Sequence, residues 1–348
     1  MTKNTEARAD TRTEIVMPRE GGPEVLEAHR RDLPAPEPGQ AVVRVEAAGA
    51  AFSEVQMLKG RYFGQPKFPF VPGYDLVGEV ESIGGGVDGG LLGKRVAALT
   101  ETGAWADRVL IDAKDAAPVP EGLDPADAVA AVTNGVTAWQ MLHRAAKVKR
   151  GQTVLVHGAS GGVGTLLVQL ARLAGAEVIG TASASKQGYV RALGAVPVDY
   201  RGDVSARVRE ISPGGVDAVF DHVGGQGLLD SYKMLRSGGT LVTYGSASTL
   251  SSTGHWIKPY LPIFARVLRW NAMPNGRRAT FYYVKRWPKF FQEDLSTVLS
   301  LLTGGKIEAH VARRMPLERA SEALELLASG KASGKVVLVP EPGTMPNS

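Results

Sequence analysis

One stretch of the chain, residues 151–186, limits the possible folds more than any other. It reads GQTVLVHGASGGVGTLLVQLARLAGAEVIGTASASK. An apolar run over residues 153–157 leads into a cluster of small residues, and a second apolar run covers residues 177–181. Apolar side chains at helical spacing lie between the two runs, at Val163, Leu166, Leu167, Leu170 and Ala174. This pattern predicts a strand, a glycine turn, a helix and a second, parallel strand, which together form a βαβ unit.

The cluster of small residues is typical of a dinucleotide site. It follows an AxGxxG pattern in which Ala159 replaces the first glycine. Glycine allows a tight turn, a close approach of the backbone to a pyrophosphate and close packing of the helix on the strand. A turn that only packs the helix is the alternative, but the position between a strand and an amphipathic helix favours nucleotide binding. We expect the pyrophosphate to bind at the helix N-terminus, against Ser160, Gly161, Gly162, Val163 and Gly164.

The end of the second strand predicts which nicotinamide cofactor binds. Enzymes that prefer NAD place an acidic residue about 20 residues further on, where it holds the ribose hydroxyls. Here the strand ends in Thr181, Ala182 and Ser183, and Lys186 follows without an intervening Asp or Glu. A solvated lysine is the alternative interpretation. Hydroxyl groups and a lysine suit a 2′-phosphate, so we predict that NADPH binds more tightly than NADH.

Composition excludes several classes of protein. The chain has 348 residues, of which 44% are hydrophobic, so it can build about two domains. It contains no cysteine, which excludes disulfides, thiolate catalysis and cysteine-bound zinc. The net charge of +5 favours anionic ligands, and no nucleic-acid motif accompanies the basic residues. The N-terminus is polar and no run approaches the roughly 18 apolar residues of a membrane span, so we expect a cytoplasmic protein without membrane contact.

The remaining sequence predicts an α/β protein of two domains. Residues 1–11 are expected to form a disordered tail. Short β-like runs between turn signals predict a β-barrel-like domain, at residues 13–16, 41–48, 76–83, 95–99 and 104–110. Helical patterns follow at 125–131 and 137–146, and strands then alternate with helices at 196–199, 216–220, 240–244 and 279–284, as in a doubly wound parallel sheet. Two amphipathic helices, 291–302 and 317–328, precede a closing strand, 335–339, that is expected to return to the first domain.

One segment, residues 250–289, combines aromatic and basic side chains. Such a segment can touch a membrane surface or cap a pocket. We favour packing on its own domain or on a sister subunit.

These features together resemble the medium-chain dehydrogenase/reductase superfamily, in its zinc-free quinone oxidoreductase branch, from about residue 13 to 340. The matching stretches are FPFVPGYDLVGEV, NGVTAWQML, VLVHGASGGVGTLLVQLARLAGAEVIGTAS, FDHVGG, GGTLVTYG and SGKVVLV. The resemblance implies a GroES-like β-barrel catalytic domain at 12–132 and 287–348, a Rossmann NADPH-binding domain at 133–286, and a homodimer. Zinc-dependent relatives carry a cysteine where Ala51 stands and a His-Glu pair where this chain has Tyr74-Asp75, so we expect no metal.

Without a metal, the expected reaction is delivery of a hydride from NADPH to a quinone or to an activated alkene such as an enone. Two alternatives stay open. The protein could be an enoyl thioester reductase of a biosynthetic pathway, or an NADPH-binding protein that interacts with partners or a membrane surface without catalysis.

The resemblance also implies a set of site residues. Lys186 and Tyr200 match positions that hold the 2′-phosphate, beside Ser183. Around the nicotinamide it implies Asn134, Thr137, Tyr244 and Gly245. At the strand end that also carries His222, we add Asp221 and Val223 as cofactor contacts.

In the substrate cleft we expect Phe52, Ser53, Tyr62 and Asn134, with Tyr62 or Ser53 in a catalytic role and Tyr62 as the candidate proton donor. Many quinone oxidoreductases have asparagine where this chain has Ala51. Asp75 is expected to support the turn after Pro72-Gly73.

Overall fold

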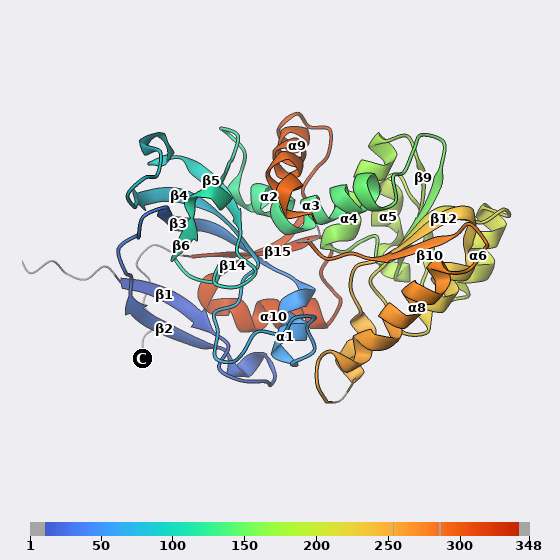
Figure 1. Ribbon diagram of the computed structural model, residues 1–348, viewed down its shortest axis with the longest axis horizontal. Helices are drawn as coiled ribbons and strands as arrows, with labels where there is room; N and C mark the ends of the chain where they lie inside the picture. Colours follow the sequence, from blue (N-terminus) through green and yellow to red (C-terminus); the bar gives the residue numbers. More distant parts are fainter. Residues whose placement is uncertain (1–10, 253, 285–286, 341–348) are drawn as a thin grey trace, which may run out of the picture.

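The computed structural model describes residues 11–252, 254–284 and 287–340. The chain forms two lobes that lie side by side along its long axis (Figure 1). The predicted disordered tail lies outside the described residues except at its last position. There the prediction is wrong, because Thr11 begins strand β1 (Thr11–Val16), which pairs antiparallel with β2 (Glu27–Asp32).

A seven-stranded sheet forms the first lobe. Its order is β14-β15-β3-β4-β5-β7, and β6 pairs with β3 off this path. The strands are β3 (Gln40–Ala50), β4 (Asp75–Ile83), β5 (Arg95–Leu99), β6 (Arg108–Asp112), β7 (Ala117–Pro118), β14 (Val311–Pro316) and β15 (Lys335–Val339). Strand β15 pairs antiparallel with β3, which confirms that the closing strand returns to the first domain. Strands β2, β7 and β14 were not predicted from the sequence.

A six-stranded parallel sheet forms the second lobe. Its order is β10-β9-β8-β11-β12-β13, so the direction of winding reverses between β8 and β11. The strands are β8 (Thr153–Val156), β9 (Glu177–Ala182), β10 (Val196–Asp199), β11 (Val216–Asp221), β12 (Leu235–Thr243) and β13 (Arg278–Phe281). The helices along this half of the chain are α4 (Gly162–Leu173), α5 (Gln187–Ala192), α6 (Val204–Ile211), α7 (Gly227–Lys233) and α8 (Leu261–Asn271). The predicted doubly wound parallel sheet is therefore confirmed.

A long helical stretch leads from the first sheet to the second. Asp124 is the N-cap of helix α2 (Pro125–Ala130), and its carboxylate accepts a hydrogen bond from the Ala126 N–H. It continues without a break through a π-helical segment (Ala131–Gly135), α3 (Val136–Trp139) and a second π-helical segment (Gln140–Ala145). The predicted domain boundary between residues 132 and 133 lies inside this stretch, and the boundaries stay a prediction.

Helices α9 (Phe291–Thr303) and α10 (Ala320–Ala328) complete the fold close to the predicted ranges. Helix α9 is tied to the long helical stretch by Asp294, which accepts hydrogen bonds from Gln140 and Arg144. None of the helices in the described ranges combines the length and apolar character needed to cross a bilayer.

The basic and aromatic segment packs mainly on its own chain. Tyr260 and Trp270 are buried, and Trp270 stacks on Tyr232 with ring centroids 4.2 Å apart. Leu261 and Leu268 of α8 are 55% and 73% exposed. Residues 253, 285 and 286 of this segment lie outside the described residues.

Candidate functional site

The glycine turn between β8 and α4 has the geometry of a pyrophosphate cradle. Gly158 has φ +64°, and a Cβ on Gly164 would collide with the Gly158 carbonyl oxygen, so the helix packs closely on the turn. Gly161 is the N-cap of α4 and provides no side-chain cap. The first N–H groups of a helix lack intrahelical partners, so those of Gly162 and Val163 can bind an anion. The residues of the turn therefore fit the phosphates of a dinucleotide.

Asn134 lies directly beside this turn. A Cβ on Gly162 would collide with the side-chain amide nitrogen of Asn134, which lies in the first π-helical segment. Thr137 follows in α3, and both side chains are buried. π-Helical turns are frequent at functional sites, because they redirect side chains that a regular helix would place elsewhere. The structure thus brings Asn134 to the glycine turn, and its place beside the nicotinamide stays a prediction.

The three residues predicted to bind the 2′-phosphate gather at the end of β9. Ser183 follows the strand, its carbonyl accepts the Lys186 N–H at 2.9 Å, and the Tyr200 N–H donates to Ala182 at 3.3 Å. The Lys186 ammonium donates to the carbonyl oxygens of Gly330 and Ala332, at 2.7 and 2.6 Å. An ammonium has three donors, so one is left for a phosphate oxygen. Burial lowers the pKa of Lys186.

Asp221 is the last residue of β11, at this edge of the sheet. Its carboxylate is fully buried and accepts hydrogen bonds from the N–H groups of Val223 and Gly224, at 2.7 and 2.9 Å, and from the Ser231 hydroxyl, at 2.6 Å. These bonds shape the loop after β11, and a contact of Asp221 with a cofactor stays a prediction. Ser231 also lies 3.0 Å from Nε2 of His157, so the network is internal.

The loops after β11 and β12 meet the glycine turn at one edge of the sheet. The Tyr244 N–H donates to the Asp221 carbonyl at 3.0 Å, and the rings of Tyr244 and His222 lie 5.9 Å apart. A Cβ on Gly158 would collide with Nε2 of His222. Gly245 follows Tyr244, and Val223 is exposed, so the predicted residues Val223, Tyr244 and Gly245 line this edge. Burial lowers the pKa of His222.

Helix α1 (Phe52–Leu58) of the first lobe faces this edge. The Gln56 amide donates to the Ser246 carbonyl at 3.1 Å and to the Thr249 hydroxyl at 3.0 Å. Phe52 packs against the larger hydrophobic core, which includes residues of both lobes, and the Ser53 hydroxyl donates to Glu54 at 2.8 Å. Gln56 thus ties α1 to the loop after β12, and a place for Phe52 and Ser53 in the substrate cleft stays a prediction.

Tyr62 lies in the loop after α1. Its hydroxyl is 2.5 Å from that of Tyr74, and the two rings meet edge to face. Burial raises the pKa of Tyr62 well above its usual value, which keeps the phenol protonated as a donor must be. Whether Tyr62 or Ser53 acts in catalysis stays a prediction.

A buried charged cluster beneath α1 was not found from the sequence. Lys335 forms an ion pair with Asp75 at 3.1 Å, with side chains 2% and 0% exposed, and Asp75 also accepts the Thr133 N–H at 3.0 Å. The expectation that Asp75 supports the turn after Pro72-Gly73 is therefore wrong. Glu54 is fully buried nearby, and burial raises its pKa to about 7. The only sequence signal was a glutamate next to the apolar residues Val55, Met57 and Leu58 of α1.

The positions of the zinc ligands in zinc-dependent relatives hold Ala51 and Tyr74 here, and these side chains are poor ligands for tetrahedral zinc. Over the ranges that the structure describes, no three His, Asp or Glu side chains gather where they could share a metal ion. The expected absence of a metal stays a prediction.

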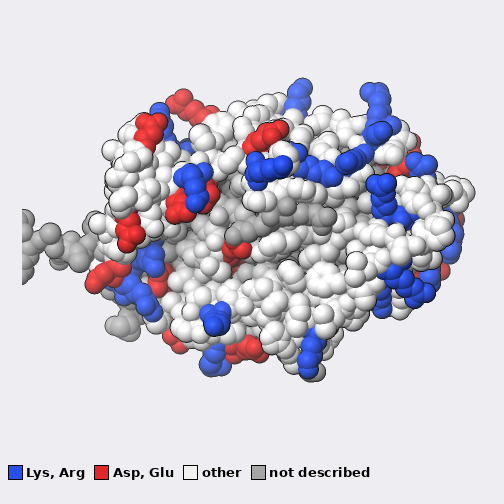
Figure 2. All heavy atoms as spheres, in the orientation of Figure 1, with Lys and Arg blue, Asp and Glu red and all other residues white. Residues whose placement is uncertain are grey.

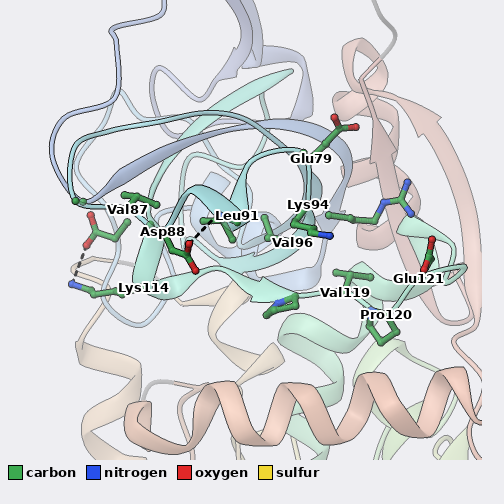
Figure 3. Close-up of a pocket in the computed structure, with 18 of the residues that line it drawn as sticks. Glu79, Val87, Asp88, Leu91, Lys94, Val96, Lys114, Val119, Pro120 and Glu121 are labelled. Carbon is green, nitrogen blue, oxygen red and sulfur yellow. Dashed lines mark hydrogen bonds and ion pairs between the residues drawn. The ribbon is translucent and has the colours of Figure 1, made fainter.

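A pocket of about 1130 Å³ opens elsewhere, in the first lobe (Figure 3). Its wall includes Asp88, Leu91 and Lys94 from the turns after β4, and Val119 and Glu121 after β7. None of the predicted site residues lines it. We therefore assign it no part in the candidate site.

Charge is unevenly spread over the surface. On the face in Figure 2, Lys and Arg side chains are frequent over the half that carries the six-stranded sheet, and they mix with Asp and Glu on the other half. This distribution suits an anionic ligand on the six-stranded sheet.

Comparisons with known proteins agree with this arrangement. A family model described as "Alcohol dehydrogenase GroES-like domain" matches residues 37–121, and one described as "Zinc-binding dehydrogenase" matches residues 193–338. The human synaptic vesicle membrane protein VAT-1 homolog is 32% identical over 320 residues, which cover 89% of this chain and 81% of that protein. A mycocerosic acid synthase-like polyketide synthase of Mycobacterium tuberculosis is 33% identical over 97% of this chain, which spans only 16% of that protein.

Among solved structures, the quinone oxidoreductase of Escherichia coli complexed with NADPH superposes with a TM-score of 0.84 and 28% identity. The match covers 94% of this chain and 100% of that one. The predicted GroES-like domain is thereby confirmed, together with the predicted parallel-sheet domain. The similarity extends over nearly the whole chain, and the chain belongs to the medium-chain dehydrogenase/reductase superfamily.

Proposed function

We propose that this protein is an NADPH-dependent oxidoreductase that delivers a hydride to a quinone or an activated alkene. The observation that carries the proposal is the uncapped N-terminus of α4 at the glycine turn, with Ser183, Lys186 and Tyr200 gathered at the end of β9. No carboxylate follows β9 to hold a ribose 2′-hydroxyl. The similarity to a quinone oxidoreductase that is complexed with NADPH supports it.

Different residues of the site bind the cofactor and donate the proton. Backbone N–H groups of Gly162 and Val163 bind the pyrophosphate, and Asn134 borders the nicotinamide end. The cofactor supplies a hydride from its nicotinamide ring when bound. With an enone, Tyr62 supplies the other hydrogen: its O–H bond breaks as a C–H bond forms at the α-carbon, and the phenol regains a proton from solvent. NADPH, a proton and the enone thus become NADP⁺ and the saturated ketone, and a quinone becomes the hydroquinone.

The test has a binding arm and a turnover arm. We expect NADPH to bind at least about 10-fold more tightly than NADH, and Lys186→Ala to weaken NADPH binding while leaving NADH binding nearly unchanged, because only NADPH carries the 2′-phosphate. Loss of nicotinamide absorbance with a panel of quinones and enones measures turnover. Equal affinity for both cofactors, or no turnover across the panel, contradicts the proposal.

The alternative of an enoyl thioester reductase has its own support. The polyketide synthase that this chain resembles over 97% of its length is a biosynthetic protein. Turnover of enoyl thioesters without turnover of free enones would favour this alternative.

A non-enzymatic role at a membrane surface has weaker support. It rests on the similarity to a synaptic vesicle membrane protein and on the exposed leucines Leu261 and Leu268 of α8, near basic Arg269. Sedimentation with anionic liposomes that is lost in Leu268→Glu would support it. A cytoplasmic location and a homodimer remain our proposals, and sedimentation velocity tests the dimer.

A further inference from the structure

Four side chains form a continuous chain of hydrogen bonds that begins at Tyr62. Its hydroxyl lies 2.5 Å from that of Tyr74, and the Tyr74 hydroxyl lies 3.2 Å from that of Tyr283. Tyr283 in turn donates to Oε2 of Glu101 at 3.1 Å. We call these four residues the tyrosine chain. They come from the loop after α1, the residue before β4, the segment after β13 and the turn after β5, so only the tertiary fold assembles them.

A backbone hydrogen bond holds two members of the tyrosine chain, Tyr74 and Glu101, beside each other. Tyr74 is 2% exposed, and its carbonyl accepts the Glu101 N–H at 3.1 Å. Glu101 has φ +64°, in the left-handed region that few non-glycine residues adopt. Such strain persists only where the surroundings impose it, and it is frequent at functional sites. Here the strained residue places a carboxylate at the end of a row of phenols.

The number of hydrogens determines the direction of donation. A phenol has one hydrogen to donate, and an ionised carboxylate can only accept. With Glu101 ionised, Tyr283 donates to Glu101, Tyr74 to Tyr283 and Tyr62 to Tyr74. When Glu101 carries a proton, the same hydroxyls can rotate and donate in the opposite direction. Tyr62 then has its hydrogen free for a substrate.

We propose that the tyrosine chain resupplies Tyr62 with the proton that it gives to the substrate, and that Glu101 takes this proton from solvent. The inference rests on the proposed function. As the Tyr62 O–H bond breaks, the hydrogen of Tyr74 moves to Tyr62, that of Tyr283 moves to Tyr74, and that of the Glu101 carboxylic acid moves to Tyr283. Glu101 is then ionised, and water returns its proton. No residue is oxidised or reduced.

Moving the protons together avoids a costly intermediate. Burial raises the pKa of Tyr74 and Tyr62 well above the usual value for tyrosine, so neither side chain is stable as a phenolate. Tyr74, Tyr283 and Glu101 do not touch the substrate in this scheme. They are positioning residues that act through Tyr62.

The central test is Tyr74→Phe, which removes one oxygen and keeps the buried ring. With an enone, we expect kcat to fall by about 10-fold or more, while KM and the Kd for NADPH stay within about twofold. The solvent deuterium isotope effect on kcat should rise, because proton supply becomes rate-limiting. Tyr232→Phe is the matched control: it removes a buried hydroxyl on α7 that lies 3.3 Å from Asn275, outside the tyrosine chain.

A double variant separates the tyrosine chain from a structural effect. If Tyr74 acts only through Tyr62, Tyr62→Phe combined with Tyr74→Phe should be no slower than Tyr62→Phe alone. Should Tyr74→Phe fail to fold, Tyr283→Phe and Glu101→Gln interrupt the same chain at less buried positions and should show the same rise in isotope effect.

Two results would overturn the inference while the wild-type enzyme remains active: unchanged kcat and isotope effect in the three single variants, or additive losses in the double variant. If the wild-type enzyme fails to oxidise NADPH with every quinone and enone of the panel, the proposed function fails, and the inference fails with it.

Discussion

Glu54 is a carboxyl group that the fold buries completely on α1. One of its oxygens accepts hydrogen bonds from the Ala51 N–H at 3.0 Å and the Ser53 hydroxyl at 2.8 Å. The other oxygen, Oε1, has no hydrogen-bond partner among the described residues. Burial raises the pKa of Glu54 to about 7, and the bond from Ser53 only partly offsets this rise.

This raised pKa predicts a pH dependence of stability. The pKa of Glu54 in the folded state lies above the usual 4.5. Its contribution to the free energy of unfolding is therefore greatest below about pH 4.5 and is lost as the pH rises through about 7. Between about pH 5 and pH 8, we expect the free energy of unfolding to fall by up to about 3 kcal/mol more in the wild type than in Glu54→Gln. Urea unfolding at both pH values measures the difference. Parallel pH profiles for the two proteins would show that Glu54 ionises freely.

The buried pair of Asp75 and Lys335 predicts a large loss from a single substitution. Lys335→Met leaves the Asp75 carboxylate buried without its counter-ion, so we expect the free energy of unfolding to fall by about 3–5 kcal/mol. Lys114→Met is the control, because the Lys114–Asp112 pair at 3.1 Å is largely exposed and should change stability by less than about 1 kcal/mol. Similar losses in both variants, measured by urea unfolding, would contradict the assigned role of burial.

At the scale of elements, the close packing of α4 on the glycine turn can be tested with a single methyl group. Gly164→Ala would push the new Cβ into the Gly158 carbonyl oxygen and the Ala159 Cα, which are backbone atoms that cannot move aside alone. We expect α4 to shift, the Kd for NADPH to rise by about 10-fold or more, and stability to fall by about 1–3 kcal/mol. Calorimetric titration and thermal unfolding measure the two effects.

Gly188→Ala in α5 provides the matched control. A Cβ at Gly188 meets nothing within 4 Å, so the same change should leave NADPH binding intact. Alanine is also the better helix former, and we expect stability to rise by up to about 1 kcal/mol. If Gly164→Ala binds NADPH as well as Gly188→Ala does, close packing of the turn is not needed for the site.

Elements with a strong local pattern were predictable, and sites made by distant contacts were not. The apolar periodicity around residues 153–181 predicted β8, α4 and β9, because each pattern lies within one continuous segment. Strand β14 was missed because its residues, VARRMP, are mostly half-buried and do not alternate. Tyr74 and Tyr283 are 209 residues apart, so no spacing in the sequence could pair them. Asp221 was placed correctly at the sheet edge, but the sequence does not show where its oxygens point.

At the scale of the whole molecule, the loop after α1 fastens the two lobes together. Arg61 donates to the carbonyl oxygens of Ser252 and Gly254, both at 2.9 Å. The ring of Phe63 packs against five aromatic side chains of the second lobe and of the segment after β13, at centroid distances of 5.2 to 6.0 Å. They are Trp256, Tyr260, Phe264, Phe281 and Tyr283. The same loop carries Tyr62, so the contact between lobes and the position of the candidate proton donor depend on one segment.

This arrangement predicts that removing the ring of Phe63 uncouples the lobes. Phe63→Ala should lower the free energy of unfolding by about 2–3 kcal/mol, less than for a fully buried phenylalanine, because the side chain is only half-buried. Phe70→Ala removes another half-buried ring, but one that packs on Phe68 within the first lobe. In scanning calorimetry we expect one transition for the wild type and for Phe70→Ala, and two for Phe63→Ala. A single transition for Phe63→Ala would mean that the long helical stretch and α9 couple the lobes without this loop.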